Sequence, residues 1–183
     1  SEHVNGTQVA TDGTKAIRMG GRTSASGAAG ISTCGIVTIG DSSSVTAVSH
    51  GILNTSIAVY RTGASISGSS RAIVAGGRNA AGVSNVIQYK VFASDADSVD
   101  LGNLYGDVAQ YAGTGAEDAT GGVVMGGNND SIDLSEVQYF TVDASPTITA
   151  SSGMDLATGD SYGAGVSDGT NASYAAGGAD KDG

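Results

Sequence analysis

Three aspartates in the middle of the chain have the spacing that oxygen ligands of a metal ion often show. They lie in the run Ser94-Asp95-Ala96-Asp97-Ser98-Val99-Asp100. Calcium takes carboxylate oxygens from such loops, so Asp95, Asp97 and Asp100 are candidate calcium ligands. The twelve-residue EF-hand pattern and its closing glutamate are absent. A polar turn between two strands is therefore the favoured interpretation, and we expect no cofactor, with calcium as the alternative.

The other reactive side chains form no recognisable catalytic set. A copper site needs several convergent nitrogen and oxygen ligands, and the chain holds two histidines, His3 and His50, and one cysteine, Cys34. We expect both histidines to be solvated loop residues and Cys34 to be a small buried apolar residue. No Gly-x-Ser-x-Gly elbow is visible. We therefore expect a non-enzymatic protein. A glycan-active enzyme with two carboxylates, whose separation the sequence does not give, remains an alternative.

The composition narrows the fold classes that could position these residues. Gly, Ala, Ser and Thr together make up 96 of 183 residues, with no Trp, one Pro and one Cys. Glycine does not recur at every third position, which excludes collagen, and a single cysteine excludes a disulfide scaffold. Abundant glycine disfavours a helical bundle. No apolar run is long enough to suggest a membrane span.

Charge is divided unequally between the two halves of the chain. Residues 1–91 carry a net charge of +4 and residues 92–183 a net charge of −14. An acidic chain offers little of the basic footprint that a nucleic acid needs, so we expect no nucleic-acid partner and no membrane insertion. The asymmetry favours solubility through like-charge repulsion. The alternative is a head-to-tail contact between copies, in which the basic half of one meets the acidic half of the next.

The chain repeats with a period of about fifty residues. Four Gly-Gly pairs each follow a short apolar run, and their first glycines are separated by 56, 50 and 51 residues: Gly20-Gly21, Gly76-Gly77, Gly126-Gly127 and Gly177-Gly178. Tyrosines keep the same register. Tyr89 and Tyr139 lie twelve residues after a pair, and a second set lies 16, 15 and 15 residues before the next pair: Tyr60, Tyr111 and Tyr162. Because the Gly-Gly pairs and both sets of tyrosines keep the same spacing, the sequence argues against a disordered chain.

The elements that carry these markers are predicted to be strands. Residues 84–92 and 135–142 alternate and are rich in Val, Ile, Tyr, Phe and Thr. Residues 35–39 are their counterpart in the first unit, without the tyrosine. Each apolar run before a Gly-Gly pair is predicted to be a short buried strand. The sequence Asp12-Gly13-Thr14 predicts a tight turn. Residues 98–101 and 147–150 are shorter strand candidates. Each unit thus holds four strands.

The Gly-Gly closures, the tyrosine twelve residues later, and the segments Val86-Ile87-Gln88-Tyr89-Lys90-Val91 and Asp100-Leu101-Gly102-Asn103-Leu104 resemble kelch repeats. They are most similar to the glycine-rich, kelch-like repeats of bacteriophage tail fibre and adhesin proteins. The tryptophan usual in kelch repeats is missing, and Leu101 or Leu104, and Leu156, stand near its place. The resemblance implies an all-β propeller of about three and a half four-stranded blades, completed by neighbours or by the rest of a longer protein.

We predict one repeat domain over residues 1–183, with units at 1–21 (partial), 22–77, 78–127 and 128–178, and a tail at 179–183. The resemblance implies a structural or receptor-binding protein of a virion or another extracellular appendage. Its partners would be its own assembly, as a homo-oligomer or with other virion proteins, and host-surface glycan or protein. The loops after each Gly-Gly pair would do the binding. Two further hypotheses are a purely structural virion or filament subunit and an intracellular kelch-type interaction module.

Overall fold

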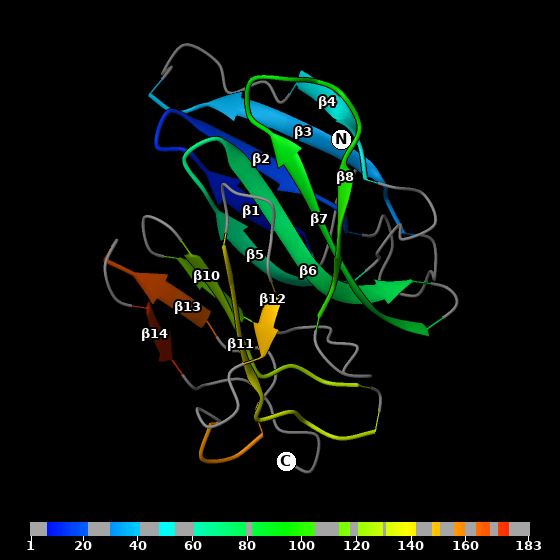
Figure 1. Ribbon diagram of the computed structural model, residues 1–183. Helices are drawn as coiled ribbons and strands as arrows, with labels where there is room; N and C mark the ends of the chain where they lie inside the picture. Colours follow the sequence, from blue (N-terminus) through cyan, green and yellow to red (C-terminus); the bar gives the residue numbers. More distant parts are fainter. Residues whose placement is uncertain are drawn as a thin grey trace.

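The computed structural model is an all-β protein made of antiparallel sheets. It describes residues 7–21, 30–40, 48–53, 61–79, 82–104, 114–117, 121–129, 131–141, 148–150, 156–159, 164–168 and 172–175. Every regular element within these ranges is a strand (Figure 1). No helix long and apolar enough to cross a membrane occurs in this part of the chain.

Three sheets of four strands follow one another along the chain, each with its strands in sequence order. The first contains β1 Gln8–Thr11, β2 Lys15–Met19, β3 Thr33–Thr38 and β4 Val48–Ile52. The second contains β5 Arg61–Ser67, β6 Arg71–Asn79, β7 Gly82–Val91 and β8 Val99–Asn103. The third contains β9 Thr114–Glu117, β10 Gly121–Met125, β11 Val137–Thr141 and β12 Ile148–Ala150. A two-stranded sheet, β13 Ala164–Ser167 and β14 Ala172–Ala175, follows. The prediction of four-stranded units is therefore confirmed.

The β1–β2 turn forms where the sequence signals it. Asp12 Oδ1 accepts hydrogen bonds from the Thr14 amide at 2.8 Å and the Lys15 amide at 2.6 Å. Gly13 takes a φ of 87°, a left-handed angle that glycine adopts without cost. Burial opposes ionisation slightly, but these hydrogen bonds and the Lys15 charge hold the pKa of Asp12 below its ordinary value. The predicted tight turn is confirmed.

The sheets stack through their first strands, because β1 contacts β5, β5 contacts β9, and β9 contacts β13. Thr11 N–H donates to Ser67 Oγ at 2.9 Å, and Ser65 Oγ donates to the Val9 carbonyl at 3.2 Å. These contacts join equivalent positions of β1 and β5, so the two strands run in the same direction. Figure 1 shows the second sheet (green) lying beside the first (blue to cyan).

Two apolar cores lie between the stacked sheets. The first core joins Ala10, Ile17, Met19, Cys34 and Leu53 of the first sheet region to Ala72, Val74 and Phe92 of the second. The second joins Ala64, Ile66, Ile73, Ala75, Ile87 and Leu104 to Val124 of the third. Alternate residues of β6 therefore enter different cores, as side chains of a strand must. The predicted burial of Cys34 as an apolar residue is confirmed, since it is 2% exposed.

The Gly-Gly pairs lie within the sheets and not at their boundaries. The pairs at 20–21 and 126–127 follow the second strand of their sheets, and Gly76-Gly77 lies within β6, two residues before its end. The predicted unit boundaries at 21, 77 and 127 therefore fall inside a sheet, and the first described sheet already has four strands. In the second sheet the register is irregular between Ala75 and Gly77, and the ladder continues to Asn79 and Gly82, so the pair lies at the base of the hairpin between the second and third strands.

Candidate functional site

Three Gly-Gly pairs occupy equivalent places at one end of the sheets, which we call the Gly-Gly edge. It comprises the pairs at 20–21, 76–77 and 126–127 and the hairpins that follow them. The residue three before each pair faces an equivalent residue on the third strand: Ile17 pairs with Ile36, Ile73 with Tyr89, and Val123 with Tyr139. The tyrosine register predicted from the sequence is thus a strand-pairing register, with Ile36 in the tyrosine place of the first sheet.

The backbone of the three pairs is nearly identical. The first glycines have φ values of 63°, 70° and 62°, and the second glycines have 109°, 129° and 113°. L-residues with a side chain rarely adopt such angles. These three pairs therefore require glycine, whereas Gly177 and Gly178 lie outside the described residues.

Close approach of another strand adds a second requirement for small residues beside the pair. Gly63 of β5 lies between the pairings Thr62–Gly77 and Ala64–Ala75. A Cβ at Gly63 would collide with the Ala75 carbonyl oxygen and lie 2.8 Å from the Gly76 carbonyl carbon. Both neighbours are backbone atoms, which cannot move aside as a flexible side chain would. The first strand therefore crosses the Gly-Gly pair at a distance that only glycine allows.

The hairpins at the Gly-Gly edge differ in length while their bases match. In the second sheet Asn79 pairs with Gly82, so two residues form the loop. In the third sheet Asn128 bridges to Asp133, so four residues form it. Asn128 Nδ2 also donates to Asp133 Oδ1 at 2.7 Å. The hairpins that follow Gly76-Gly77 and Gly126-Gly127 therefore differ in the length of their tips.

The loop of the third sheet is held by its own side chains. Asn129 Oδ1 accepts hydrogen bonds from the Ser131 and Ile132 amides, each at 3.0 Å. This Asx turn fixes the loop without help from a core. Ile132 stands at its tip and is 60% exposed.

A leucine marks the same register and is missing from the sequence-based set of markers. Leu53, Leu104 and Leu156 follow the fourth strand region of each sheet, and their amides donate to the carbonyls of Ser32, Asn85 and Ser135, each at 2.7 Å. Leu53 and Leu104 are buried at 0% and 2% exposure. The sequence places Leu104 and Leu156 near the missing kelch tryptophan. Leu53, at a spacing of 51 residues from Leu104, is the signal that a search for repeated leucines would have found.

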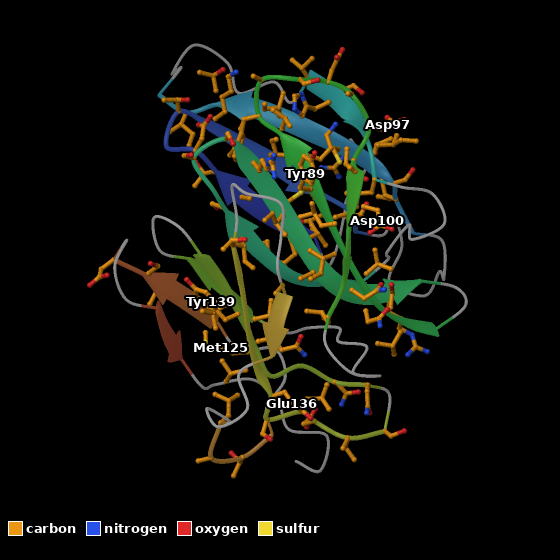
Figure 2. All side chains as sticks on the ribbon, in the orientation of Figure 1. Tyr89, Asp97, Asp100, Met125, Glu136 and Tyr139 are labelled. Carbon is orange, nitrogen blue, oxygen red and sulfur yellow. The ribbon has the colours of Figure 1, made fainter. Side chains whose placement is uncertain are left out.

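The tyrosine marker has a different neighbour in each sheet. The Arg71 guanidinium carbon lies 4.4 Å from the centroid of the Tyr89 ring, a cation–π contact. In the third sheet Gly121 takes the place of Arg71, and its missing Cβ leaves room for the Tyr139 ring. Tyr89 packs at the edge of the second core, and Tyr139 is 37% exposed (Figure 2). Tyr60, Tyr111 and Tyr162 lie outside the described residues.

Polar side chains join β4 of the first sheet to the end of β7 and the β7–β8 segment of the second sheet. The Ser98 amide donates to the Ile52 carbonyl at 2.9 Å, and the Ile52 amide donates to Asp97 Oδ1 at 3.1 Å. His50 Nε2 lies 3.0 Å from the Val91 carbonyl, and His50 is 6% exposed. The expectation that His50 is a solvated loop residue is therefore wrong. His50 lies in β4, and the loop that follows β7 covers it, whereas His3 lies outside the described residues.

A lysine is buried in the same place. Lys90 is 1% exposed, and its ammonium donates to the Ala96 carbonyl. Burial lowers the pKa of Lys90, against the opposing influence of Cys34, Asp97 and Asp95. Burial raises the pKa of the Cys34 thiol to about 11, although the charges of Lys90 and Arg18 act in the other direction. Lys90 and His50 are buried and each faces a backbone carbonyl, so these two side chains have a structural role at the contact between the two sheets.

The three candidate calcium ligands do not converge. Asp97 accepts a hydrogen bond from the Ile52 amide, and Asp100 Oδ1 accepts one from the Gly102 amide at 2.7 Å, so both carboxylates shape the backbone. Figure 2 shows Asp97 and Asp100 apart from Glu136, which lies near the third sheet. Nowhere in the described ranges do three His, Cys, Asp or Glu side chains gather as a metal site would need.

Comparison with protein-family models and with curated proteins finds no match for this chain. The functional interpretation therefore rests on the geometry of the sheets and their hairpins.

Proposed function

We propose that the chain is a non-enzymatic, kelch-like β-propeller segment that displays the Gly-Gly edge for attachment to a host surface. It would belong to a bacteriophage tail fibre or a similar extracellular appendage. The observation that carries the proposal is the combination of a repeated, rigid hairpin base with a variable tip. Such an arrangement suits recognition, because a fixed scaffold holds loops that change without cost to the fold.

The stacking of the sheets supports the propeller part of the proposal. In a propeller, blades of four antiparallel strands pack face to face, with equivalent strands lining a common axis. The contacts from β1 through β5 and β9 to β13 fit that arrangement. Ala10, Ala64 and Gly115 on these strands leave space for close approach.

Display of many copies supports the attachment part of the proposal. A single exposed isoleucine on a short loop gives a weak contact. Many copies on one particle would convert weak contacts into firm attachment, because every contact after the first is intramolecular. The partner class that fits is a glycan or protein of a cell surface.

The test uses the chain displayed in many copies on fluorescent beads, applied to a glycan array and to intact bacterial cells. We expect binding that falls at least tenfold with Ile132→Asp, because this change places a charge at the tip of the Gly-Gly edge. The matched control is Ile39→Asp. Ile39 is 50% exposed after β3, at the other end of the first sheet. Blank arrays and cells for the parent chain, or equal loss in both variants, would exclude attachment through this edge.

A purely structural subunit is the second candidate, and one observation favours it. The first half of the chain has a net charge of +4 and the second half −14, which suits contact between copies more than contact with a receptor. In that case the Gly-Gly edge would be covered in the intact particle. An image of the particle would distinguish the two, since a displaying edge must face solvent.

A further inference from the structure

The contact between the first and second sheets holds three reactive side chains that attachment through the Gly-Gly edge does not use. Cys34 and His50 come from the first sheet and Lys90 from the second, and all three are buried. The His50 ring is accounted for by its contact with the Val91 carbonyl. The thiol of Cys34 and the amine of Lys90 remain, and each is a nucleophile in its deprotonated form.

Packing of two sheets does not by itself require these two groups. Ile87 holds in the second sheet the place that Cys34 holds in the first, and Phe140 in the third sheet holds the place of Lys90. Ile87 is 0% exposed in the second core. The contact between the second and third sheets thus has apolar residue types at the positions where the first contact has a thiol and an amine. Their presence in the first contact calls for a separate explanation.

The Lys90 amine reaches the strand next to Cys34. The pairing of β3 with β4 is irregular at Cys34, which places Cys34 across from His50 and Gly51. A Cβ at Gly51 would lie 2.6 Å from Lys90 Nζ, and neighbouring strands are about 4.8 Å apart. Both side chains face the same core, since Cys34 belongs to the first core and Lys90 pairs with Ala72 of that core.

The electrostatics of the two groups agree with this placement. Burial raises the pKa of Cys34 to about 11, and Lys90 acts on it more strongly than the other charged neighbours, Arg18 and Asp97. Burial lowers the pKa of Lys90, and Cys34 acts on it more strongly than the aspartates do. The lowered pKa favours the neutral amine, which carries the lone pair that a nucleophile needs. The raised pKa keeps the thiol mostly protonated, so its oxidation is slow at neutral pH.

We propose that oxidation by a peroxide joins Cys34 to Lys90 through a covalent sulfur–nitrogen bond. In the first step the Cys34 thiolate attacks hydrogen peroxide, the O–O bond breaks, and sulfur is oxidised by two electrons to a sulfenic acid. In the second step the Lys90 amine attacks this sulfur, the S–O bond breaks, and the oxygen leaves as water with a proton from the amine. One thiol, one amine and one peroxide thus give one sulfenamide and two waters.

The bond would fasten the first sheet to the second, because Cys34 lies in β3 and Lys90 in β7. A cross-link between distant positions of the chain stabilises the fold mainly by restricting the unfolded state. The oxidised protein should therefore resist unfolding better than the reduced protein. The inference goes beyond attachment, because it concerns the contact between two sheets and not the hairpin tips.

The test treats the full reduced chain with hydrogen peroxide and follows its intact mass and tryptic peptides by mass spectrometry. We expect a product about 2 Da lighter than the parent, a peptide pair that joins Cys34 to Lys90, and reversal by dithiothreitol. The rate should rise about tenfold between about pH 8 and 9, because the thiolate is the reactive form and the pKa of Cys34 is about 11. The melting temperature of the linked protein should be about 5–10 °C higher. A product that gains oxygen without a linked peptide pair would overturn the proposal.

Two lysine variants show which amine takes part. Lys90→Gln removes the amine and should lower the yield of the linked product at least tenfold, while Cys34 is oxidised onward to heavier acids. The matched control is Lys15→Gln. Lys15 Nζ lies 3.5 Å from the Phe92 carbonyl at the same contact between sheets, and this variant should cross-link as the parent does. Equal yields in the two variants would overturn the proposal. The peptide map of the parent identifies the linked residues directly, so it decides the question even where Lys90→Gln fails to fold.

Discussion

The first and second sheets have the same strand order and the same Gly-Gly geometry, yet among the described residues the first sheet packs against another sheet through one face and the second sheet through both. In β6, Ala72 and Val74 face one core while Ile73 and Ala75 face the other, and all four are 0% exposed. In β2, Ile17 and Met19 are buried, and Arg18 takes the place of Val74.

The difference shows that position in the stack decides which residue types a strand tolerates. A strand between two sheets needs small apolar residues at every position, because both faces approach another sheet at close range. A strand at the end of the stack keeps only alternate positions apolar. Strand propensity alone does not distinguish a strand that lies between two sheets from one that packs on a single face, since both are predicted as short strands.

The largest expected effect comes from exchanging the two residues that define this difference. Val74→Arg places a charge between the first and second sheets without a partner, and we expect a loss of about 3–5 kcal/mol in the free energy of unfolding. Arg18→Val should change it by less than about 0.5 kcal/mol, because the Arg18 side chain is half-buried and partly solvated. Urea unfolding at low protein concentration measures both. Equal effects would show that the faces are equally covered.

Replacing the leucine that follows the fourth strand with alanine should destabilise the second and third sheets to different extents. The loss in the free energy of unfolding should be larger where this leucine is more deeply buried. Leu104→Ala removes a side chain that is 2% exposed in the second core, so we expect a loss of about 2–4 kcal/mol. Leu156 is half-buried beside Met125 and Val137, so Leu156→Ala should lower the free energy of unfolding by about half as much as Leu104→Ala. Thermal and urea unfolding of both variants provides the measurement. A larger loss at Leu156 would contradict this ranking.

The free energy of unfolding at alkaline pH should depend on the protonation of Cys34, which lies in the core between the first and second sheets. The pKa of Cys34 is raised from 9.0 to about 11 in the folded protein. Its protonated form therefore contributes stability that is complete below pH 9 and is lost as pH rises toward 11, by at most about 2–3 kcal/mol. Lys90 acts oppositely, because its lowered pKa makes its burial less costly as pH rises toward 10.5.

Comparison with Cys34→Ala isolates the thiol. The difference in unfolding free energy between the parent chain and this variant should shrink as pH rises from 9 to 11, while Lys90 affects both chains similarly. Urea titrations at several pH values follow this difference. A difference that stays constant would mean that the thiol reaches water in the folded state.

The smallest expected effect concerns the cation–π pair of the second sheet. Arg71→Ala should cost about 0.5–1 kcal/mol, because the guanidinium leaves the Tyr89 ring. Lys15 holds the equivalent position in the first sheet, where Ile36 stands in place of the tyrosine, so Lys15→Ala should cost less. A double-mutant cycle of Arg71→Ala with Tyr89→Leu measures the coupling. Zero coupling would show that Tyr89 contributes through packing alone.

Local pattern predicts much of the fold. The predicted strands at 84–92 and 135–142 correspond to β7 and β11, and the short candidates at 98–101 and 147–150 correspond to β8 and β12. These predictions succeed because alternation and turn residues act within a few positions of the chain. The predicted unit boundaries at 21, 77 and 127 fall within the described four-stranded sheets, because a Gly-Gly pair does not indicate which strands share a sheet.

Predictions that depend on distant contacts are weaker. His50 precedes a glycine, which suggests a loop, but His50 lies in β4 and its Nε2 faces the carbonyl of Val91, the last residue of β7, 41 residues away. The aspartates at 95, 97 and 100 have a metal-like spacing, yet Asp97 is held by Ile52 of another sheet. No local signal identifies such partners, because they come from a neighbouring unit.

The sequence by itself determined the all-β class, the four-strand period and the positions that must be glycine. These follow from side-chain alternation and from backbone angles, which are properties of each unit taken alone. Only the tertiary structure decided which described faces of the sheets are covered and why Lys90 and His50 are buried. Those outcomes depend on which side chains of the neighbouring sheet lie opposite each residue. Burial therefore depends on how two sheets pack together and not on the sequence of either sheet alone.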